Sequence, residues 1–199
     1  MTTKTRSAMN EKSLATNGAK GNGSAKMVVM SSKVPPQLAT PTDLKAEEVQ
    51  AVTEAVNPLI ADAFALYLKT KNFHWHLASS HFRDYHLLFD EHAEQLLDSI
   101  DPLAERVRRI GGTTLRSVSH VSQLQSIADD NRDFVLAEQM IQSLLADNLH
   151  IAKKMRDAME LAEEKRDHPT SNLLQEILDV TEKRIWFLYE ISTGGQNQE

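Results

Sequence analysis

Cysteine is absent from this chain of 199 residues. Disulfide bonds, thiolate metal sites and cysteine-based catalysis are therefore excluded, and a metal ion could be bound only by His, Asp and Glu side chains. The chain has 8 histidines and 28 acidic residues that could supply such ligands. The lack of cysteine also fits a reducing compartment.

Long hydrophobic runs are missing as well. No segment approaches the roughly 18 consecutive apolar residues that a membrane-spanning helix needs. The one early apolar run, residues 27–30, is too short for the core of a secretory signal. The hydrophobic fraction of 41% and the charged fraction of 25% are ordinary for a globular protein. We therefore expect a cytoplasmic protein that does not enter a membrane.

Large apolar and aromatic residues are scarce before residue 42, where Gly, Ser, Thr, Asn, Ala and Lys prevail. Such a segment buries too little apolar area to offset the entropy of ordering, so residues 1–42 are predicted to form a disordered tail. The bundle domain is expected at 43–193, and residues 194–199 form a short C-terminal tail. Six basic residues lie in the N-terminal tail: Lys4, Arg6, Lys12, Lys20, Lys26 and Lys33.

The charge of the chain is divided unevenly. The N-terminal tail has six basic residues against Glu11 alone, a net charge of +5, whereas the rest has 16 basic and 27 acidic residues, a net charge of −11. A basic arm could bind a polyanion such as DNA, and an acidic body attracts cations. Lysine-bearing termini are also common where they only keep a protein soluble, so both interpretations of the tail stay open.

Glycine and proline are few, at 7 and 6 residues, and they separate long stretches in which apolar residues recur at helical spacing. A short helix is expected in the connection at 117–127, because an irregular link of that length would be unusual. Four long helices without a convincing strand predict an all-α, antiparallel four-helix bundle. The long helices are expected at 44–76, 81–110, 135–165 and 169–192.

Individual residues predict where these helices begin and end. Thr42 is the expected N-cap of the first helix. Pro58 is expected to kink that helix or to delay its start. Gly111 and Gly112 should end the second helix in a left-handed turn, and Pro169 suits the first turn of the last helix.

Five of the eight histidines lie between positions 74 and 92, close to a run of carboxylates. His86 and Asp90 are four residues apart and share a helix face, as do Asp101 and Glu105. Both pairs lie on roughly one stripe, because the eleven residues from Asp90 to Asp101 make about three turns. At about 1.5 Å per residue, however, His86 and Asp101 are some 22 Å apart. One chain cannot bind one ion with both pairs.

Two arrangements remain open. Each pair could belong to a separate site, or two subunits could pack about a two-fold axis so that the pairs meet. His74 could join His86 if the turn between the first two helices folds back. Imidazole and carboxylate ligands suit iron, and also zinc or manganese, although zinc is redox-inert. Without the histidines, Asp101 and Glu105 would suit a solvated acidic face paired with arginine.

These motifs resemble the Dps family, the DNA-protecting mini-ferritins of starved bacterial cells. The resemblance covers about residues 50–192 and rests on the runs KTKNFHWH at 69–76, HFRDYH at 81–86 and DPLAER at 101–106. The ferroxidase ligands of that family follow the order His, His, Asp, Asp and Glu along the chain. Successive ligands are twelve, four, eleven and four residues apart. This chain keeps every interval with His74, His86, Asp90, Asp101 and Glu105.

The resemblance implies a ferritin-like bundle with a short helix in its long connection, and a hollow shell of twelve subunits. It also implies composite sites between subunits that take two iron ions each. Fe(II) would be oxidised there, preferably by hydrogen peroxide, and stored as ferric mineral, which protects DNA from oxidative damage. Some members of the family bind DNA through basic tails, which would associate the protein with the nucleoid.

Two other functions compete with the ferroxidase hypothesis. The di-iron enzymes whose site lies inside the bundle use Glu-x-x-His on two helices, and no histidine in this chain has Glu three residues before it. A non-enzymatic oligomer that only compacts DNA would be expected to have a degraded ligand set. Because all five ligands are present, the ferroxidase is the stronger hypothesis.

Overall fold

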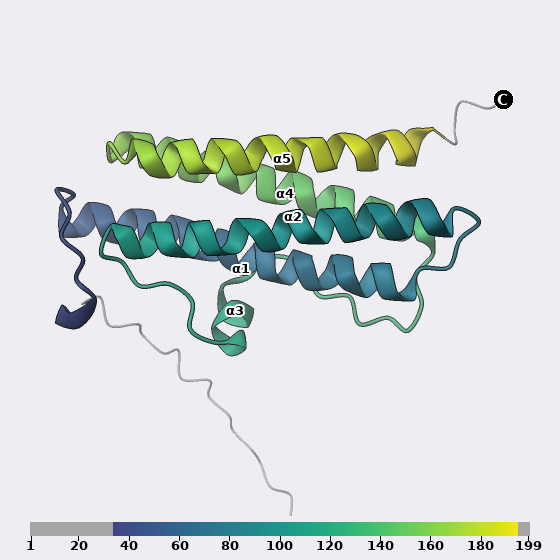
Figure 1. Ribbon diagram of the computed structural model, residues 1–199, viewed down its shortest axis with the longest axis horizontal. Helices are drawn as coiled ribbons and strands as arrows, with labels where there is room; N and C mark the ends of the chain where they lie inside the picture. The colour runs from purple at the N-terminus through teal and green to yellow at the C-terminus, as the bar shows by residue number, and fades with distance from the viewer. Residues whose placement is uncertain (1–33, 195–199) are drawn as a thin grey trace, which may run out of the picture. The chain divides into compact units, whose positions relative to one another are not determined.

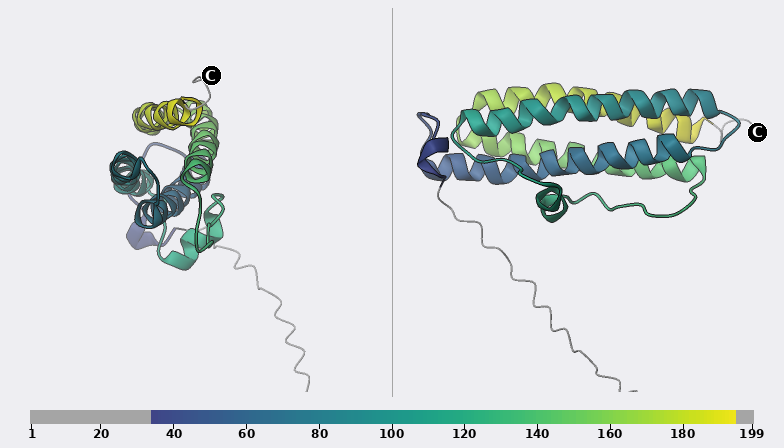
Figure 2. Two further views of the ribbon diagram at one scale, coloured as in Figure 1. Left: turned by 90° about the vertical axis from the view of Figure 1, so that its right-hand side faces the viewer. Right: turned by 60° about the horizontal axis from the view of Figure 1, so that its bottom comes forward.

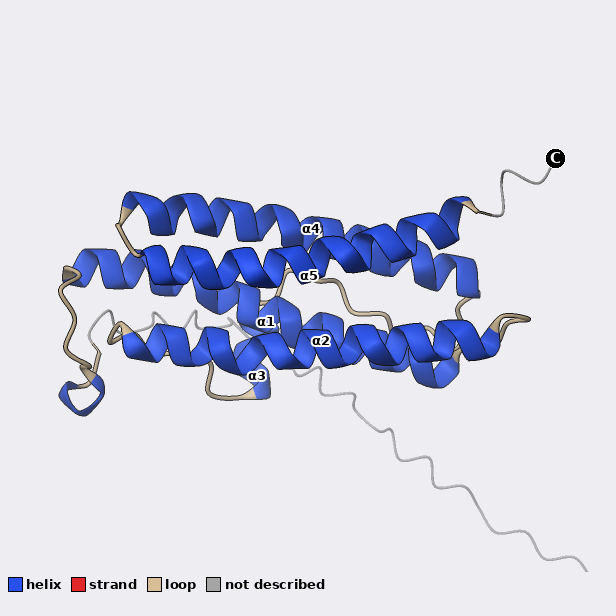
Figure 3. Cartoon of the chain, turned by 45° about the horizontal axis from the view of Figure 1, so that its top comes forward, coloured by secondary structure: helices blue, strands red, loops and turns tan. Residues whose placement is uncertain are grey.

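The computed structural model describes residues 34–194, and every regular element in that range is helical (Figures 1 and 3). The prediction of an all-α chain is confirmed. The tail residues 1–33 and 195–199, which include all six basic residues, lie outside the described range, so the predicted disorder stays a prediction. The elements are η1 (Pro36–Leu38), α1 (Ala46–His76), α2 (Phe82–Arg109), α3 (Val118–Leu124), α4 (Ala137–Glu164) and α5 (His168–Thr193).

Four long helices form an antiparallel bundle in which α1 packs along α2 and α4 packs along α5. Seen end-on, the four helices surround a common core, and the short α3 lies outside them against α1 (Figure 2). Short turns join α1 to α2 and α4 to α5. The connection from α2 to α4 runs along the bundle and carries α3 (Figure 1). This is the predicted crossover with its short helix.

The core consists of the apolar stripes that the helical spacing predicted. Burial of these side chains, rather than helix propensity, provides most of the stability of such helices. Phe73 of α1 and Phe89 of α2 are fully buried, close to the ends of the two helices that carry the histidines. Other fully buried core residues are Leu59, Ile60, Leu66, Leu103, Met140, Leu144, Ile151, Leu174 and Leu188.

The predicted N-cap at Thr42 is wrong. Helix α1 begins at Ala46, and the hydroxyl of Thr42 instead accepts a hydrogen bond from the Leu44 N–H at 3.3 Å. The Glu48 carboxylate accepts from the Lys45 N–H at 2.8 Å, so an acidic side chain in the first turn satisfies the backbone at the helix start. The Thr42 side chain thus stabilises a local turn instead of capping α1.

Pro58 does not mark the start of α1, which continues through it from Ala46 to His76. A proline inside a helix removes one backbone hydrogen bond. The next two residues, Leu59 and Ile60, are each 1% exposed. Their packing in the core compensates for the lost bond, which illustrates how tertiary contacts override local propensity.

The predicted stop of α2 is confirmed at Gly111. Its φ of 85° is left-handed, and its N–H donates to the Arg108 carbonyl at 3.0 Å. A Cβ atom at this position would come within 2.9 Å of the Thr40 carbonyl oxygen. Arg108 also donates to the Leu38 carbonyl at 2.9 Å. The part of the predicted tail that the structure describes therefore contacts the end of α2.

Helix α5 begins at His168 with Pro169 in its first turn, as predicted. Asp167 caps it by accepting from the Thr170 N–H at 3.3 Å, and Arg106 of α2 pairs with the same carboxylate at 2.5 Å. The Arg106–Asp167 ion pair therefore connects the turn between α4 and α5 to α2.

Among the described helices, only α1 is long and apolar enough to pass a length-and-composition test for a membrane span. Half of its most apolar window is buried inside the bundle, which is typical of the central helix of a folded domain.

Candidate metal centre

Two histidines from different helices meet where the turn at 77–81 folds α2 back on α1. His74 lies in the last turn of α1 and is buried, and half-buried His86 lies in the first turns of α2. Their rings stack with centroids 3.7 Å apart and planes inclined by 19°. Phe82 stacks on the outer side of His86, with centroids 5.0 Å apart. The packing of both rings therefore fixes their orientation.

The hydrogen bonds of the two rings are reciprocal and define their tautomers. His74 Nδ1 lies 2.8 Å from the carbonyl oxygen of His86, and His86 Nδ1 lies 3.1 Å from that of His74. A carbonyl oxygen only accepts, so each Nδ1 is protonated and donates. In the neutral form of each ring, Nε2 then carries the lone pair that a metal ion can bind. Imidazoles that ligate metals are commonly oriented by such a second hydrogen bond.

Asp90 lies one helical turn after His86 and is oriented by a lysine. Its Oδ1 is 2.5 Å from Lys71 Nζ and 3.9 Å from His74 Nε2. The hydrogen bond from Lys71 is the largest effect on the carboxyl group and lowers its pKa. The charge of Lys71 acts in the same direction, as do His74 and His86 when they are protonated, whereas desolvation opposes them. Asp90 is thus a carboxylate whose present counterion is Lys71.

The acid pair lies far along the same helix. Asp101 and Glu105 are exposed on the later turns of α2, about 22 Å from the histidines by helical rise. Glu105 pairs with Arg109 at 2.6 Å, and both side chains are more than half exposed. Within residues 34–194, no three His, Asp or Glu side chains of the single chain gather where they could hold one ion. The candidate ligands therefore form two separate groups, called here the histidine half (His74, His86 and Asp90) and the acid half (Asp101 and Glu105).

A broad apolar surface flanks the histidine half. Phe64, Leu68 and Trp75 of α1 and Val118 of α3 are exposed, with Trp75 at 60%. They line a hollow of about 1000 Å³ between α1, α3 and the loop near Arg132. Apolar surfaces of this kind often mark contacts with another protein chain.

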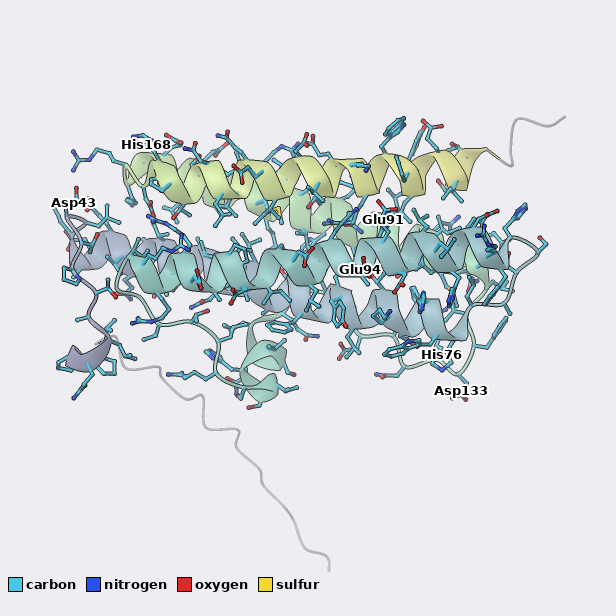
Figure 4. All side chains as sticks on the ribbon, in the orientation of Figure 1. Asp43, His76, Glu91, Glu94, Asp133 and His168 are labelled. Atoms are coloured by element: carbon cyan, nitrogen blue, oxygen red, sulfur yellow. The ribbon has the colours of Figure 1, made fainter. Side chains whose placement is uncertain are left out.

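Sequence reasoning missed Lys71, although a signal was present. Lys71 precedes His74 by three residues on α1, so the two side chains share a helix face. His76, which had no assigned role, is exposed at the end of α1 and bonds the Asn72 carbonyl through Nδ1 at 2.9 Å (Figure 4). His81 is exposed and packs obliquely against Tyr85.

Two further histidines lie away from His74 and His86. His92 is 3% exposed, and burial, followed by the charges of Arg184 and Lys183, lowers its pKa to about 3. His150 of α4 bonds the Ser126 hydroxyl at 2.8 Å. Both lie outside the histidine half of the site.

Comparison with known proteins gives a consistent family assignment. The model of the ferritin-like domain matches residues 53–194. An uncharacterised low temperature-induced protein of a Nostoc species is 32% identical over 152 residues, which is 76% of this chain and 85% of that protein. DNA protection during starvation protein 2 of Bacillus anthracis is 31% identical and covers 69% of this chain and 93% of its own length.

Solved structures agree with these relatives. DpsC from Streptomyces coelicolor superposes with a TM-score of 0.75 at 27% identity and covers 83% of this chain and 95% of its own. The Dps protein of Vibrio cholerae O1, described as a member of a broad superfamily of ferritin-like diiron-carboxylate proteins, gives 0.71 at 28% identity, with 76% and 95% covered. The predicted ferritin-like fold is confirmed.

Proposed function

This chain belongs to the ferritin-like family and, within it, to the Dps proteins, and on that premise we propose that it is a ferroxidase and iron-storage protein. Fe(II) is its substrate, bound as two ions at each site between two subunits. Hydrogen peroxide is the preferred oxidant, and the ferric product is stored inside a hollow homo-oligomer, expected to have twelve subunits.

The reciprocal histidine pair supports this proposal most strongly. A buried imidazole and a half-buried one each have Nδ1 bonded to a carbonyl, which leaves Nε2 for a metal ion in the neutral ring. His74 Nε2 lies 3.9 Å from the Asp90 carboxylate. Nitrogen and oxygen ligands with open positions suit Fe(II) and leave room for an oxidant. The two bonds orient both rings before a metal ion arrives, so little ordering remains to be done on binding.

The missing ligands would come from a second subunit. In a two-fold contact each surface meets its own copy, so the acid half of one chain would reach the histidine half of the other. The exposed apolar surface around Phe64, Leu68 and Trp75 is suited to be covered in such a contact. Two equivalent composite sites would then form in each pair of subunits.

The reaction removes two reagents that together damage DNA. One molecule of hydrogen peroxide accepts one electron from each of two Fe(II) ions and, with two protons, becomes two molecules of water. His74, His86, Asp90, Asp101 and Glu105 would hold the ions, and Asp101 and Glu105 supply the oxygen ligands that ferric iron favours. When iron binds, the metal ion must replace Lys71 as the partner of Asp90 and Arg109 as the partner of Glu105.

Direct DNA binding by the tail is a second candidate function. It is favoured by the net charge of +5 on residues 1–42, with basic residues at Lys4, Arg6, Lys12, Lys20, Lys26 and Lys33. Many tails on one shell would bind multivalently even if each is weak. Such binding should weaken steeply with salt, because phosphate contacts release counterions. It would place the protein at the nucleoid within the cytoplasm.

The ferroxidase proposal is tested by anaerobic Fe(II) loading followed by hydrogen peroxide, with ferric formation measured by absorbance and particle size by light scattering. The wild type should oxidise iron rapidly and keep it soluble in a large particle. The double variant His86→Ala, Asp101→Ala should assemble but lose rapid oxidation. Unchanged kinetics in an assembled double variant would refute the assignment of these residues.

A further inference from the structure

A second polar cluster lies inside the bundle, where α2, α4 and α5 meet. Arg184 of α5 is only 2% exposed. Its guanidinium donates from Nε to Asn148 Oδ1 at 2.9 Å and from Nη2 to Thr181 Oγ1 at 2.8 Å. Nη1 donates to Gln95 Oε1 at 3.5 Å, which is a long contact. All three acceptors are neutral.

Within the part of the chain that the structure describes, this charge has no counterion. Among the side chains of residues 34–194, no carboxylate lies within 4.0 Å of the Arg184 guanidinium. Burial lowers the pKa of Arg184 to about 10, so it remains a cation at neutral pH. A buried charge without an opposite charge is strongly unfavourable. Three of the five guanidinium N–H groups have protein acceptors, and two do not.

The neighbouring groups do not neutralise it. His92 is buried beside it and uncharged at neutral pH, since its pKa is lowered to about 3. Glu91, on the side of α2 next to α5 (Figure 4), is bonded by the Gln95 amide at 3.1 Å and has its own cation, Lys183, at 3.9 Å. The negative charge of Glu91 is therefore separated from Arg184 by the Gln95 side chain.

A cavity of about 270 Å³ opens beside Arg184 between α2 and α5. Gln95, Ser99 and Ile177 are among its lining residues, and the exposed carboxylates Asp98 and Glu176 line its solvent end. A water molecule takes about 30 Å³ in the liquid, so the cavity has room for a small polyatomic ion and accompanying water.

We infer that this cavity binds a small inorganic oxyanion of the phosphate class through Arg184. Arg184 lines the cavity, and one N–H on each of its Nη1 and Nη2 atoms remains for two oxygens of such an ion. The binding supplies the negative charge that this part of the bundle lacks. Waters alone would satisfy the N–H groups but would leave the charge unpaired. Chloride would pair the charge but accept fewer directed hydrogen bonds.

The carboxylates at the solvent end oppose the binding of an anion. Asp98 and Glu176 repel it, so the attraction of the Arg184 charge must exceed this repulsion. The inferred binding is therefore distinct from the proposed ferroxidase function. The binding of phosphate to iron-free protein does not depend on that function and tests the site alone.

The experiment uses the assembled, full-length, iron-free protein in chloride-free buffer at constant ionic strength. Inorganic phosphate is titrated by calorimetry, and the melting temperature is followed in parallel. In the variant Gln95→Glu, a carboxylate of nearly the same size replaces the neutral acceptor of Arg184 and becomes its internal counterion. The exposed carboxylate of Glu91 can turn away towards Lys183. Gln142→Glu, at an exposed position of α4, is the matched control for charge.

The wild type and Gln142→Glu should bind phosphate saturably and melt at a higher temperature with it. Gln95→Glu should bind at least tenfold more weakly and show no shift. Arg184→Gln, which removes the charge itself, should also lose binding. The inference is overturned by an absence of saturable binding in the wild type, by equal binding in Gln95→Glu and Gln142→Glu, or by an equal stabilisation with chloride.

Discussion

The two halves of the candidate site both include residues of α2, but their side chains are held in different ways. At the start of α2, His86 is stacked and hydrogen-bonded with His74, so the nitrogen ligands are oriented in the single chain. Near its end, Asp101 and Glu105 are exposed, and Glu105 is bound only to Arg109. Within one subunit, the histidine half is therefore rigid and the acid half adaptable.

This difference suggests that the two halves have different roles in iron binding. The histidine half should determine where Fe(II) binds, because its geometry is fixed before binding. The acid half should adjust as the iron changes from Fe(II) to Fe(III) and demands more oxygen ligands. Variants of the two halves should therefore differ in the size of their effects.

Loss of a preoriented ligand should have the largest effect. In His86→Ala, one Nε2 ligand disappears and the Nδ1 partner of the His74 carbonyl is lost as well. We expect rapid Fe(II) oxidation to fall by about 100-fold, the upper end of the cost for groups that only orient ligands. Stopped-flow absorbance after peroxide addition measures this. A residual rate within fivefold of wild type would show that the histidine pair does not hold the substrate.

Removal of the lysine at the histidine half should act in the opposite direction. Lys71→Met frees Asp90 from its counterion, so Fe(II) no longer competes with an ammonium group. We expect about tenfold tighter metal binding, or roughly 1.4 kcal/mol, measured by anaerobic titration with Fe(II) or Co(II). Lys71→Arg keeps the charge and should remain close to wild type. Weaker binding in Lys71→Met would mean that Lys71 helps to form the site.

Removal of the arginine at the acid half should matter less. The Glu105–Arg109 pair is more than half exposed, and such pairs contribute only about 0–1 kcal/mol. Arg109→Gln should therefore tighten Fe(II) binding by less than about fivefold in the same titration. A larger gain in Fe(II) affinity in Arg109→Gln than in Lys71→Met would contradict the expected difference between the two halves.

The smallest expected effect is on stability at acid pH. The pKa of Asp90 is lowered by Lys71, so the pair stabilises the fold above the ordinary carboxyl pKa of about 3.9. That contribution disappears as the pH falls through the lowered pKa. Melting temperatures of iron-free wild type and Lys71→Met should thus differ slightly at pH 6 and converge near pH 2. A difference that grows on acidification would contradict the pairing.

The sequence predicted the helices well because their apolar residues follow a strict period, and every long helix begins and ends within two residues of its expected range. It also predicted the separation of the two half-sites, since helical rise alone sets the distance between His86 and Asp101. The N-cap of α1 was wrongly assigned to Thr42, because the hydroxyl of Thr42 bonds the Leu44 N–H in a local turn instead.

The helical period does not determine the contacts that side chains make between helices, so the meeting of His74 and His86 was left open. The stacking of His74 on His86 depends on the path of the turn at 77–81, and the Lys71–Asp90 pair depends on how α1 packs on α2. The burial of Arg184 was not predicted, because a helical period shows which face a residue occupies but not whether its charge has a partner.

The central claim is that each working site combines the histidine half of one subunit with the acid half of another. The decisive measurement is the peroxide-dependent oxidation rate of assemblies formed by refolding or co-expressing His86→Ala and Asp101→Ala chains in equal amounts. Each variant alone should be inactive. With random pairing, half the subunit pairs are mixed, and each mixed pair has one intact site of two, so about one quarter of the wild-type rate should return. If the mixed assemblies remain as inactive as the separate variants, the two halves do not meet between subunits and the account is wrong.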